Sequence, residues 1–299
     1  MLYIKCTKDY LEYFKEESTI PNFCKKLIFI YKKLFGKITK TKSNNGEVWL
    51  IPNDSLKFKE NIIKFLKIYH VNTLVLSNNI LSWKEEIEKL NIRVLDGKWL
   101  YRYLISDITK YICLNKNQNM QEQNISIIIR NTQEIDFENT KNLSENCRSL
   151  NLVTKDEYKF RRLEEVLYKE KGIVLNSSYN YKRSLLKSNI IINVDLDEKE
   201  FNKFALPRKA VIINLEKTKI YNKGFDGINI LNYEIELPEK YLDKVLKTDS
   251  FNKEVLYESY VYKKTSPQNI LNEIKRDNLK LMHLIGKSGS IDIKEYLKV

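Results

Sequence analysis

Short apolar segments alternate with amphipathic segments along this chain, and this alternation restricts the possible folds more than any other feature of the sequence. In the N-terminal half we expect strands at 47–53, 71–79 and 92–98, and helices at 55–70, 81–91 and 99–114. Strands that alternate with helices in this way build a parallel sheet that the helices cover. The first half of the chain therefore predicts an α/β unit.

The same alternation begins again after a polar segment at residues 116–124. The expected strands are 124–131, 151–156, 173–178, 190–196 and 209–215, and the expected helices are 137–150, 157–172, 181–188 and 197–206. The last two strands contain the β-branched runs IIINV and AVIINL, which are typical of strands buried on both faces. A second α/β unit is therefore predicted, with one further strand at 227–238.

The two ends of the chain complete this organisation. At the N-terminus we expect a strand at 2–6, a helix at 22–35 that Pro21 opens, and a loop at 39–47. The C-terminal region predicts helices at 241–248, 252–262 and 266–277, and then a strand and a glycine turn at 279–291. The expected fold class is α/β: two Rossmann-like three-layer αβα units with parallel sheets and a C-terminal helical tail. The expected domains are 1–117, 118–238 and 239–299, of which the last is mostly helical and packs back on the others.

The composition argues against several classes of protein. No run of 18 apolar residues occurs and the N-terminus lacks the pattern of a signal peptide, so we expect a cytoplasmic protein without a membrane partner. The four cysteines form no C-x-x-C pair and the chain has two histidines, so no metal site is expected. Abundant Lys, Asn and Ile, with scarce Gly, Pro and Ala, are typical of an AT-rich genome and favour a bacterial source.

The formal net charge is +13, which suggests a nucleic-acid partner as one hypothesis. Most of the excess is lysine spread along the whole chain, as on solvated helix faces. A basic, nucleic-acid-associated protein therefore stays open as an alternative function.

The strand at 124–131 runs into the residues where a dinucleotide enzyme has its glycine-rich phosphate loop. Here these residues are Arg130, Asn131, Thr132 and Gln133, and no glycine lies between residues 115 and 171. Glycines are needed at this point because backbone N–H groups must come close to the pyrophosphate. The sequence therefore argues against the usual mode of dinucleotide binding.

The second α/β unit nevertheless resembles a known family. The order ISIIIRN, LVTKD, GIVLNSS, SNIIIN and AVIINL over residues 120–220 resembles the Rossmann domain of the shikimate-dehydrogenase-like amino-acid dehydrogenases. The resemblance implies NAD(P) as the cofactor, with Thr154, Lys155 and Asp156 near the adenosine ribose. The glycine loop of that family is absent, and its Lys and Asp for proton transfer have no counterpart in the N-terminal half.

Polar residues at the ends of the expected strands are the candidate ligand contacts, since ligands of open α/β sheets bind at the carboxyl ends of strands. For a cofactor they are Arg130, Asn131, Thr154, Lys155, Asn193 and Asn214. A buried Asn amide needs a partner, so Asn193 and Asn214 predict contacts either with nearby loop backbone or with a ligand. The acidic group Asp195, Asp197 and Glu198 predicts a helix N-cap, or alternatively a Mg²⁺ site or an acid–base pair.

The first unit offers a second set of candidates. They are Ser77 and Asn78 at the end of one strand, and Asp96 and Lys98 around Gly97 at the end of the next. Gly97 would allow a tight turn into a helix whose N-terminus could take an anion. The segments VNTLVL and IRVLDGKWLYRYL here also resemble BRCT domains locally, although the glycine pair of those domains is missing.

These observations favour a non-catalytic binding or interaction module built on a degenerate Rossmann-like fold, with a protein partner or a second copy of the chain. An NAD(P)-dependent oxidoreductase with a divergent phosphate loop is the enzymatic alternative. The basic nucleic-acid-associated protein is the third hypothesis.

Overall fold

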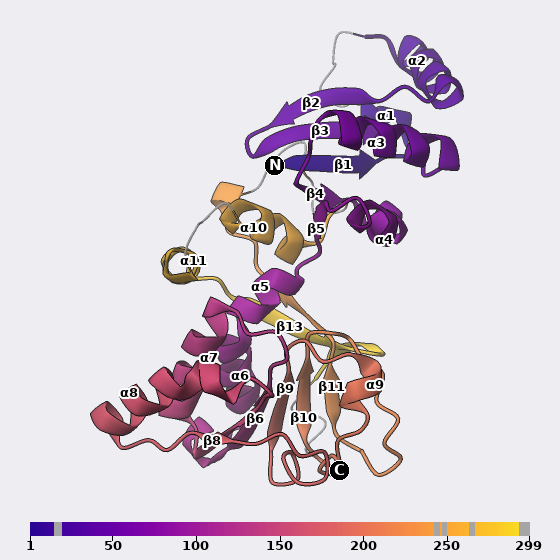
Figure 1. Cartoon of the computed structure of the whole chain (residues 1–299). Helices are drawn as coiled ribbons and strands as arrows, with labels where there is room; N and C mark the ends of the chain where they lie inside the picture. The colour runs from indigo at the N-terminus through magenta and orange to yellow at the C-terminus, as the bar shows by residue number, and fades with distance from the viewer. Residues whose placement is uncertain (15–19, 242–245, 247–249, 263–266, 293–299) are drawn as a thin grey trace. The chain divides into compact units, whose positions relative to one another are not determined.

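Two compact units make up the chain, and each unit combines two separate stretches of sequence. The computed structural model describes residues 1–14, 20–241, 246, 250–262 and 267–292 (Figure 1). Unit 1 comprises Met1–Gly97 with Leu237–Thr265, and unit 2 comprises Lys98–Glu236 with Ser266–Val299. Both are mixed α/β with parallel sheets, as the alternation predicted. The units divide the chain at other points than 117 and 238, and the domain boundaries expected from the sequence stay a prediction.

Unit 1 contains a five-stranded sheet with the strand order β2-β3-β1-β4-β5. The strands are β1 (Leu2–Cys6), β2 (Thr39–Ser43), β3 (Gly46–Ile51), β4 (Thr73–Leu76) and β5 (Arg93–Leu95). All neighbours pair in parallel except β2, which runs antiparallel to β3. In the middle of the sheet Ile4 is aligned with Trp49 on one side and Leu76 on the other, and all three side chains are buried.

Unit 1 also contains helical segments. They are α1 (Tyr10–Tyr13), α2 (Asn22–Phe35), α3 (Leu56–Ile68), η1 (Asn78–Trp83), α4 (Lys84–Glu88), η4 (Glu239–Tyr241) and α10 (Lys253–Val261). In α3 the buried residues Phe58, Ile62 and Leu66 recur at four-residue steps, which places them on one face of the helix against the sheet.

The expected loop at 39–47 is wrong, because residues 39–43 form the strand β2 and make a hairpin with β3. Asn44 and Asn45 form the turn, followed by Gly46, whose position leaves no room for a side chain: an added Cβ would lie 1.9 Å from the Met1 carbonyl oxygen. Asn-Gly is a strong hairpin signal and threonine favours strands, and both indicate this edge strand. The polar composition of the segment instead favoured a loop.

The helix α10, from the C-terminal part of the chain, belongs to the core of unit 1 and lies beside β5 (Figure 1). Tyr3 Oη and Ser259 Oγ are 2.7 Å apart, and the Gly97 N–H donates to Glu258 Oε2 at 2.8 Å. The ring of Phe251, just before α10, contacts that of Tyr3 edge-on, with 6.0 Å between centroids. The sequence predicts this helix at 252–262 as part of a tail that packs back on the other domains, and the structure places it in unit 1.

Unit 2 contains a six-stranded parallel sheet with the order β11-β10-β9-β6-β7-β8. The strands are β6 (Asn124–Ile128), β7 (Ser149–Val153), β8 (Asn176–Ser177), β9 (Ile190–Asn193), β10 (Val211–Asn214) and β11 (Ile228–Ile230). Counted along the chain, this is the 3-2-1-4-5-6 order of a Rossmann fold. The Rossmann-like fold that the family resemblance implied is therefore confirmed for this unit.

The helices of unit 2 are mostly those expected. They are α5 (Lys98–Tyr103), α6 (Ile105–Asn115), η2 (Met120–Glu122), α7 (Glu134–Asn146), η3 (Glu157–Phe160), α8 (Arg161–Lys171), α9 (Glu198–Phe201) and α11 (Pro267–Arg276). Gly172 ends α8 in the left-handed conformation, as predicted. The expected helix at 181–188 is wrong: this segment forms turns, in which Ser184 Oγ accepts the Asn180 N–H and Asn180 Oδ1 accepts the Lys182 N–H. Such side-chain hydrogen bonds compete with a helix.

A small antiparallel sheet completes unit 2. It contains β12 (Asn232–Ile235), β13 (Leu281–Gly286) and β14 (Gly289–Ile291), in this order. The single strand expected at 227–238 is thus two strands, β11 and β12, which belong to different sheets. The strand and glycine turn expected at 279–291 are confirmed. Most of the helix expected at 241–248, and Ser266, lie outside the described residues.

Candidate functional site

The switch point of the six-stranded sheet lies between β6 and β9, because the chain continues from these neighbouring strands in opposite directions. From β6 it proceeds to β7 and β8, and from β9 to β10 and β11. Ligands of open α/β sheets bind at such a point, outside the carboxyl ends of the strands. Arg130 and Asn131 follow β6 here, and Asp195 follows β9.

The carboxylate of Asp195 occupies the hydrogen-bond donors of this loop. Its Oδ1 accepts the backbone N–H of Arg130 and its Oδ2 accepts that of Asn131, each at 2.7 Å. The Asp195 side chain is 9% exposed. Backbone N–H groups after the first strand of a Rossmann fold are the donors that bind a phosphate. In this chain an internal anion is bound to them.

Arg102 of α5 connects the same loop to α7. Its Nε and Nη2 donate to the two carboxylate oxygens of Asp136 at 2.8 and 2.6 Å, and Nη2 also donates to the Asn131 carbonyl at 2.7 Å. The Asp195 carboxylate lies 3.9 Å from Nη2. A guanidinium paired with a carboxylate through two hydrogen bonds is strongly oriented. The positive charge of Arg102 beside this loop is therefore largely neutralised by the protein itself.

Asp136 is the most buried member of this group, with no exposed side-chain surface. It lies in the first turn of α7 and accepts the Gln133 N–H at 2.7 Å in a capping box. Burial raises the pKa of Asp136 above its ordinary value, while the hydrogen bonds from Arg102 and Gln133 oppose this change. The pair thus fixes the loop between β6 and α7 from the inside.

The other acidic candidates also have partners. Asp197 caps α9 by accepting the Glu200 N–H at 2.9 Å, which agrees with the capping interpretation, and its Oδ2 lies 2.9 Å from Arg130 Nη1. Glu198 accepts the Tyr221 hydroxyl and the Lys219 N–H, and these bonds lower the pKa of Glu198. Among the described residues, no group of three or more His, Cys, Asp or Glu side chains is arranged to hold a metal ion.

Asn193 and Asn214 end the neighbouring strands β9 and β10 and are aligned in register. Both are fully buried, and Asn193 Nδ2 donates to Asn214 Oδ1 at 3.2 Å. Asn193 also bonds the Leu196 backbone in both directions, at 3.0 Å, and Asn214 bonds the Thr218 backbone and hydroxyl. These contacts are the loop partners that buried amides require. A role in ligand binding stays a prediction.

The variant Asn193→Ala is expected to lose about 1–3 kcal/mol of unfolding free energy, because the buried Leu196 N–H and the Asn214 amide would each lose a partner. Urea denaturation followed by circular dichroism measures this change. Asn146→Ala is a suitable control, because the Asn146 amide bonds the Asn142 carbonyl on an exposed helix surface. Equal costs for the two variants would contradict a structural role of the Asn193 contacts.

Thr154 and Lys155 follow β7, on the side of β6 away from β9. Thr154 is fully buried and its Oγ1 accepts the Asp156 N–H at 3.1 Å. Lys155 is exposed, with its Nζ 4.9 Å from the centre of the Tyr179 ring. Within the loop after β6, the hydroxyl of Thr132 is buried and has no hydrogen-bond partner among the described residues. A buried hydroxyl of this kind can form a hydrogen bond with a ligand atom.

The candidates from the first half of the chain have partners within the protein, and their role as a site stays a prediction. Ser77 is buried, and its Oγ accepts the Cys6 N–H at 3.0 Å, while the Asn78 N–H donates to the Ser250 carbonyl at 2.9 Å. Asp96 pairs with Lys84 in unit 1. Lys98 starts α5 in unit 2, where it pairs with Glu216, which follows β10.

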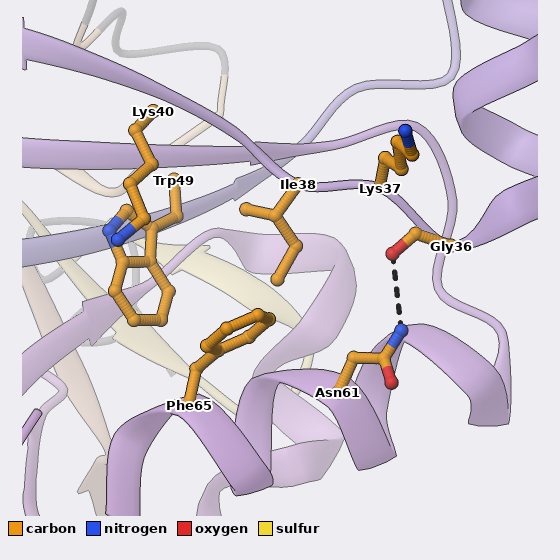
Figure 2. Close-up of a pocket in the computed structure, with 7 residues that line it drawn as sticks. All are labelled: Gly36, Lys37, Ile38, Lys40, Trp49, Asn61 and Phe65. Atoms are coloured by element: carbon orange, nitrogen blue, oxygen red, sulfur yellow. Dashed lines mark hydrogen bonds between the residues drawn. The ribbon is translucent and has the colours of Figure 1, made fainter. Parts of the chain in front are cut away.

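A pocket of about 320 Å³ lies in unit 1 between β2, β3 and α3. Figure 2 shows that Trp49, Ile38 and Phe65 line its apolar part, with Lys37 and Lys40 beside them. Lys40 Nζ lies 4.8 Å from the centre of the Trp49 ring, in the range of a cation–π contact. Sequence reasoning missed this pocket because the strand β2 had been expected to be a loop.

Sequence reasoning also missed Arg102 and Asp136. Both lie in segments that were expected to be helices, and Arg102 had been assigned to the N-terminal domain. The available signal was a single arginine among the apolar residues of WLYRYLI, since an arginine in such a setting is buried only when it has a partner.

No protein-family model matches this sequence, and no curated protein sequence matches it significantly. Among solved structures, the chain is similar to a Trypanosoma cruzi protein named as an aspartate carbamoyltransferase, with 15% identity and a TM-score of 0.25 over 55% of this chain and 58% of that one. A Leishmania major Friedlin protein of the same name is 12% identical, with a TM-score of 0.27 over 71% and 69% of the two chains. L-tryptophan dehydrogenase from Nostoc punctiforme is 8% identical, with a TM-score of 0.32 over 100% and 88%.

The chain spans 58% of the length of the first of these proteins. At such TM-scores the likenesses carry no argument about activity, substrate or family. Membership of the dehydrogenase family therefore stays a prediction, and the Rossmann-like assignment rests on the strand order of unit 2 itself.

Proposed function

We propose that this chain is a non-catalytic α/β protein, in which unit 2 keeps the Rossmann-like sheet but has lost the dinucleotide site. It acts by binding partners through its surface. The observation that supports this proposal most directly is the Asp195 carboxylate, which accepts the N–H groups of both Arg130 and Asn131 at 2.7 Å.

Electrostatics explains why this contact works against a dinucleotide. A pyrophosphate would have to displace Asp195 from the two N–H groups and would then lie next to a second negative charge, which is unfavourable at short distance. Arg102 offers little compensation, because Asp136 already binds its guanidinium through two hydrogen bonds. The absence of glycine between residues 115 and 171 adds a steric obstacle.

Thermal denaturation with NAD⁺, NADH, NADP⁺ and NADPH tests this proposal. A ligand at about a hundred times its Kd would add about 2.7 kcal/mol of stability, so binding would be easy to see. We expect no stabilisation of the wild-type protein. Stabilisation by any of the four dinucleotides would contradict the proposal.

The variant Asp195→Ala tests the role of the carboxylate itself. It is expected to lose about 1–3 kcal/mol of unfolding free energy, because two N–H groups lose a charged acceptor. Arg130→Ala is the matched control, because it keeps the backbone N–H of residue 130 but removes the ion pair between Arg130 and Asp197. The side chains of both residues are 55% exposed. Exposed pairs contribute about 0–1 kcal/mol, so the control is expected to cost less. Equal costs in urea denaturation would rule out a stabilising role of the Asp195 contacts with the Arg130 and Asn131 N–H groups.

The NAD(P)-dependent oxidoreductase is the second candidate function. Its support is the buried Thr132 hydroxyl, for which the described residues provide no hydrogen-bond partner, together with Thr154 and Lys155 after β7. In this alternative, Lys155→Ala would weaken a stabilisation by NAD(P) that the wild-type protein shows.

A further inference from the structure

The helix α2 turns an apolar face toward solvent, the reverse of the usual arrangement. Phe23, Leu27, Ile30 and Leu34 recur at three- and four-residue steps and are 72%, 51%, 43% and 65% exposed. A stripe with this spacing normally faces the core of a protein. In α2 the buried residues lie elsewhere on the helix: they are Lys25 and Phe29.

The exposed stripe is broad. Tyr31 and Phe35 widen it on one side, where they are 46% and 61% exposed and their ring centroids are 4.6 Å apart. On a helical wheel at 3.6 residues per turn, these exposed apolar residues span an arc of roughly 140°, with Ile30 at one edge and Phe35 at the other. This is wider than a narrow helix–helix seam and is suited to a flat apolar environment.

The segment of chain that contains α2 has charges of a single sign, although Glu47, directly after it, lies 3.8 Å from Lys40 Nζ. Between residues 20 and 46 the sequence contains seven lysines and neither Asp nor Glu. Five of these lysines are exposed: Lys26, Lys33, Lys37, Lys40 and Lys42. Lysines beside an apolar helix face can place their stems along the apolar region and their ammonium groups at a negatively charged layer.

The helix is held in place by the rest of unit 1. Lys57 Nζ donates to the Leu34 carbonyl at 2.7 Å, and Asn61 Nδ2 donates to the Gly36 carbonyl at 3.1 Å. On the inner side, the rings of Phe29 and Tyr13 pack edge-on at 5.2 Å. The apolar face is therefore already formed before any partner binds.

From this face and its charges we propose that α2 binds an anionic lipid surface, with its apolar stripe in the headgroup–acyl boundary and its lysines among the headgroups. An interfacial helix of this kind combines a large apolar face with Lys-rich flanks. Protein interfaces are instead depleted in Lys, and a second copy of α2 would bring lysines of like charge together.

A helix that lies in the membrane plane does not have to span the bilayer. None of the helices in the described part of the chain has the length and apolar character that crossing would require. The expectation of no membrane partner rested on the lack of a spanning segment and of a signal peptide, and neither absence concerns binding at the surface of a bilayer. The lipid proposal concerns unit 1 and is independent of the proposal for unit 2.

Co-sedimentation of the full chain with vesicles tests the proposal. Vesicles of phosphatidylcholine are compared with vesicles that also contain phosphatidylserine, at low and high salt. We expect the chain to bind the anionic vesicles at least tenfold more strongly, and this preference to weaken at high salt. Equal binding to both kinds of vesicle, or binding to neither, would overturn the proposal.

Two variants locate the contact on α2. Leu27→Ser with Leu34→Ser, and Lys26→Gln with Lys33→Gln, are each expected to lower vesicle binding at least fivefold. The matched controls lie in unit 2: Leu114→Ser, at a residue that is 73% exposed, and Lys169→Gln with Lys187→Gln, at two exposed lysines. All altered residues except Lys187 lie on described helices, and circular dichroism confirms that the variants are folded. Vesicle binding that these α2 variants leave unchanged would place the contact elsewhere and overturn the proposal.

Two further measurements distinguish other occupants. If a single-stranded oligonucleotide binds the chain and the Lys variant loses this binding while the Leu variant keeps it, α2 is a nucleic-acid contact and the lipid proposal fails. If analytical ultracentrifugation shows a dimer that the Leu variant abolishes, while vesicles do not bind, the stripe is a self-association surface and the proposal fails as well.

Discussion

Replacing Asp136 by alanine is expected to cost about 3–5 kcal/mol of unfolding free energy, because it leaves the Arg102 guanidinium buried without its carboxylate partner. Arg102 is buried, and two of its nitrogens donate to Asp136 at 2.8 and 2.6 Å. The variant also removes the acceptor of the Gln133 N–H at the start of α7. Guanidinium chloride denaturation followed by circular dichroism measures the loss.

A double variant separates the free-energy cost of leaving one charge unpaired from the net contribution of the whole pair to stability. Burial raises the pKa of Asp136, so the charged carboxylate is less favourable at this position than in water. Arg102→Met combined with Asp136→Leu removes both charges, and we expect it to recover most of the stability that Asp136→Ala loses. Glu165→Ala is the exposed control: Glu165 and Lys169 form a pair with 68% and 74% exposed side chains, and its loss is expected to cost less than about 1 kcal/mol. If Asp136→Ala loses as little unfolding free energy as the control, the Arg102–Asp136 pair does not stabilise the loop between β6 and α7.

The fragment 1–117, which is the N-terminal domain expected from the sequence, should fail to unfold cooperatively by itself. It lacks α10, in which Val255, Leu256, Tyr257, Glu258, Ser259 and Val261 are buried. Without this helix the Tyr3 hydroxyl loses Ser259 and the Gly97 N–H loses Glu258, and an apolar face of unit 1 would be open to water.

Joining residues 237–262 to the fragment through a long Gly/Ser linker should restore a cooperative thermal transition. The control is the same fusion with Leu256 and Tyr257 both replaced by serine, which leaves the linker unchanged but removes two buried side chains of α10. Cooperative unfolding of the fragment 1–117 without α10 would instead favour the sequence-based domain boundary.

Local patterns predicted most of the strands and helices of this chain. Runs of β-branched residues located β9 and β10, and the helical spacing of apolar residues located α2, α3 and α8. Local patterns were less informative where the hydrogen bonds of polar side chains or pairing with a distant strand determine the backbone conformation. The polar hairpin strand β2 was expected to be a loop, and the hydrogen-bonded turns around Asn180 were expected to be a helix.

The candidate site was predictable only as an edge of a sheet. Because carboxyl ends of parallel strands meet at one edge, Arg130, Asn131, Asn193 and Asn214 could be named from the sequence. The partners of these residues could not be named, since the loop after β6 and Asp195 are about sixty residues apart and no local rule relates them. The same holds for Arg102 and Asp136, whose pairing depends on the packing of α5 near α7.

The interleaving of the two units has a consequence for the order in which they can form during synthesis. Unit 1 stops at Gly97 and resumes at Leu237, so its α10 leaves the ribosome only after the whole first segment of unit 2, residues 98–236, has been made. At translation rates of about 5–20 residues per second, this delay is roughly 8–30 s. Throughout that time the strands β1 to β5 lack the helix that buries part of their surface. A nascent chain of this protein therefore has a defined interval in which chaperones can reach a sheet that the finished protein conceals.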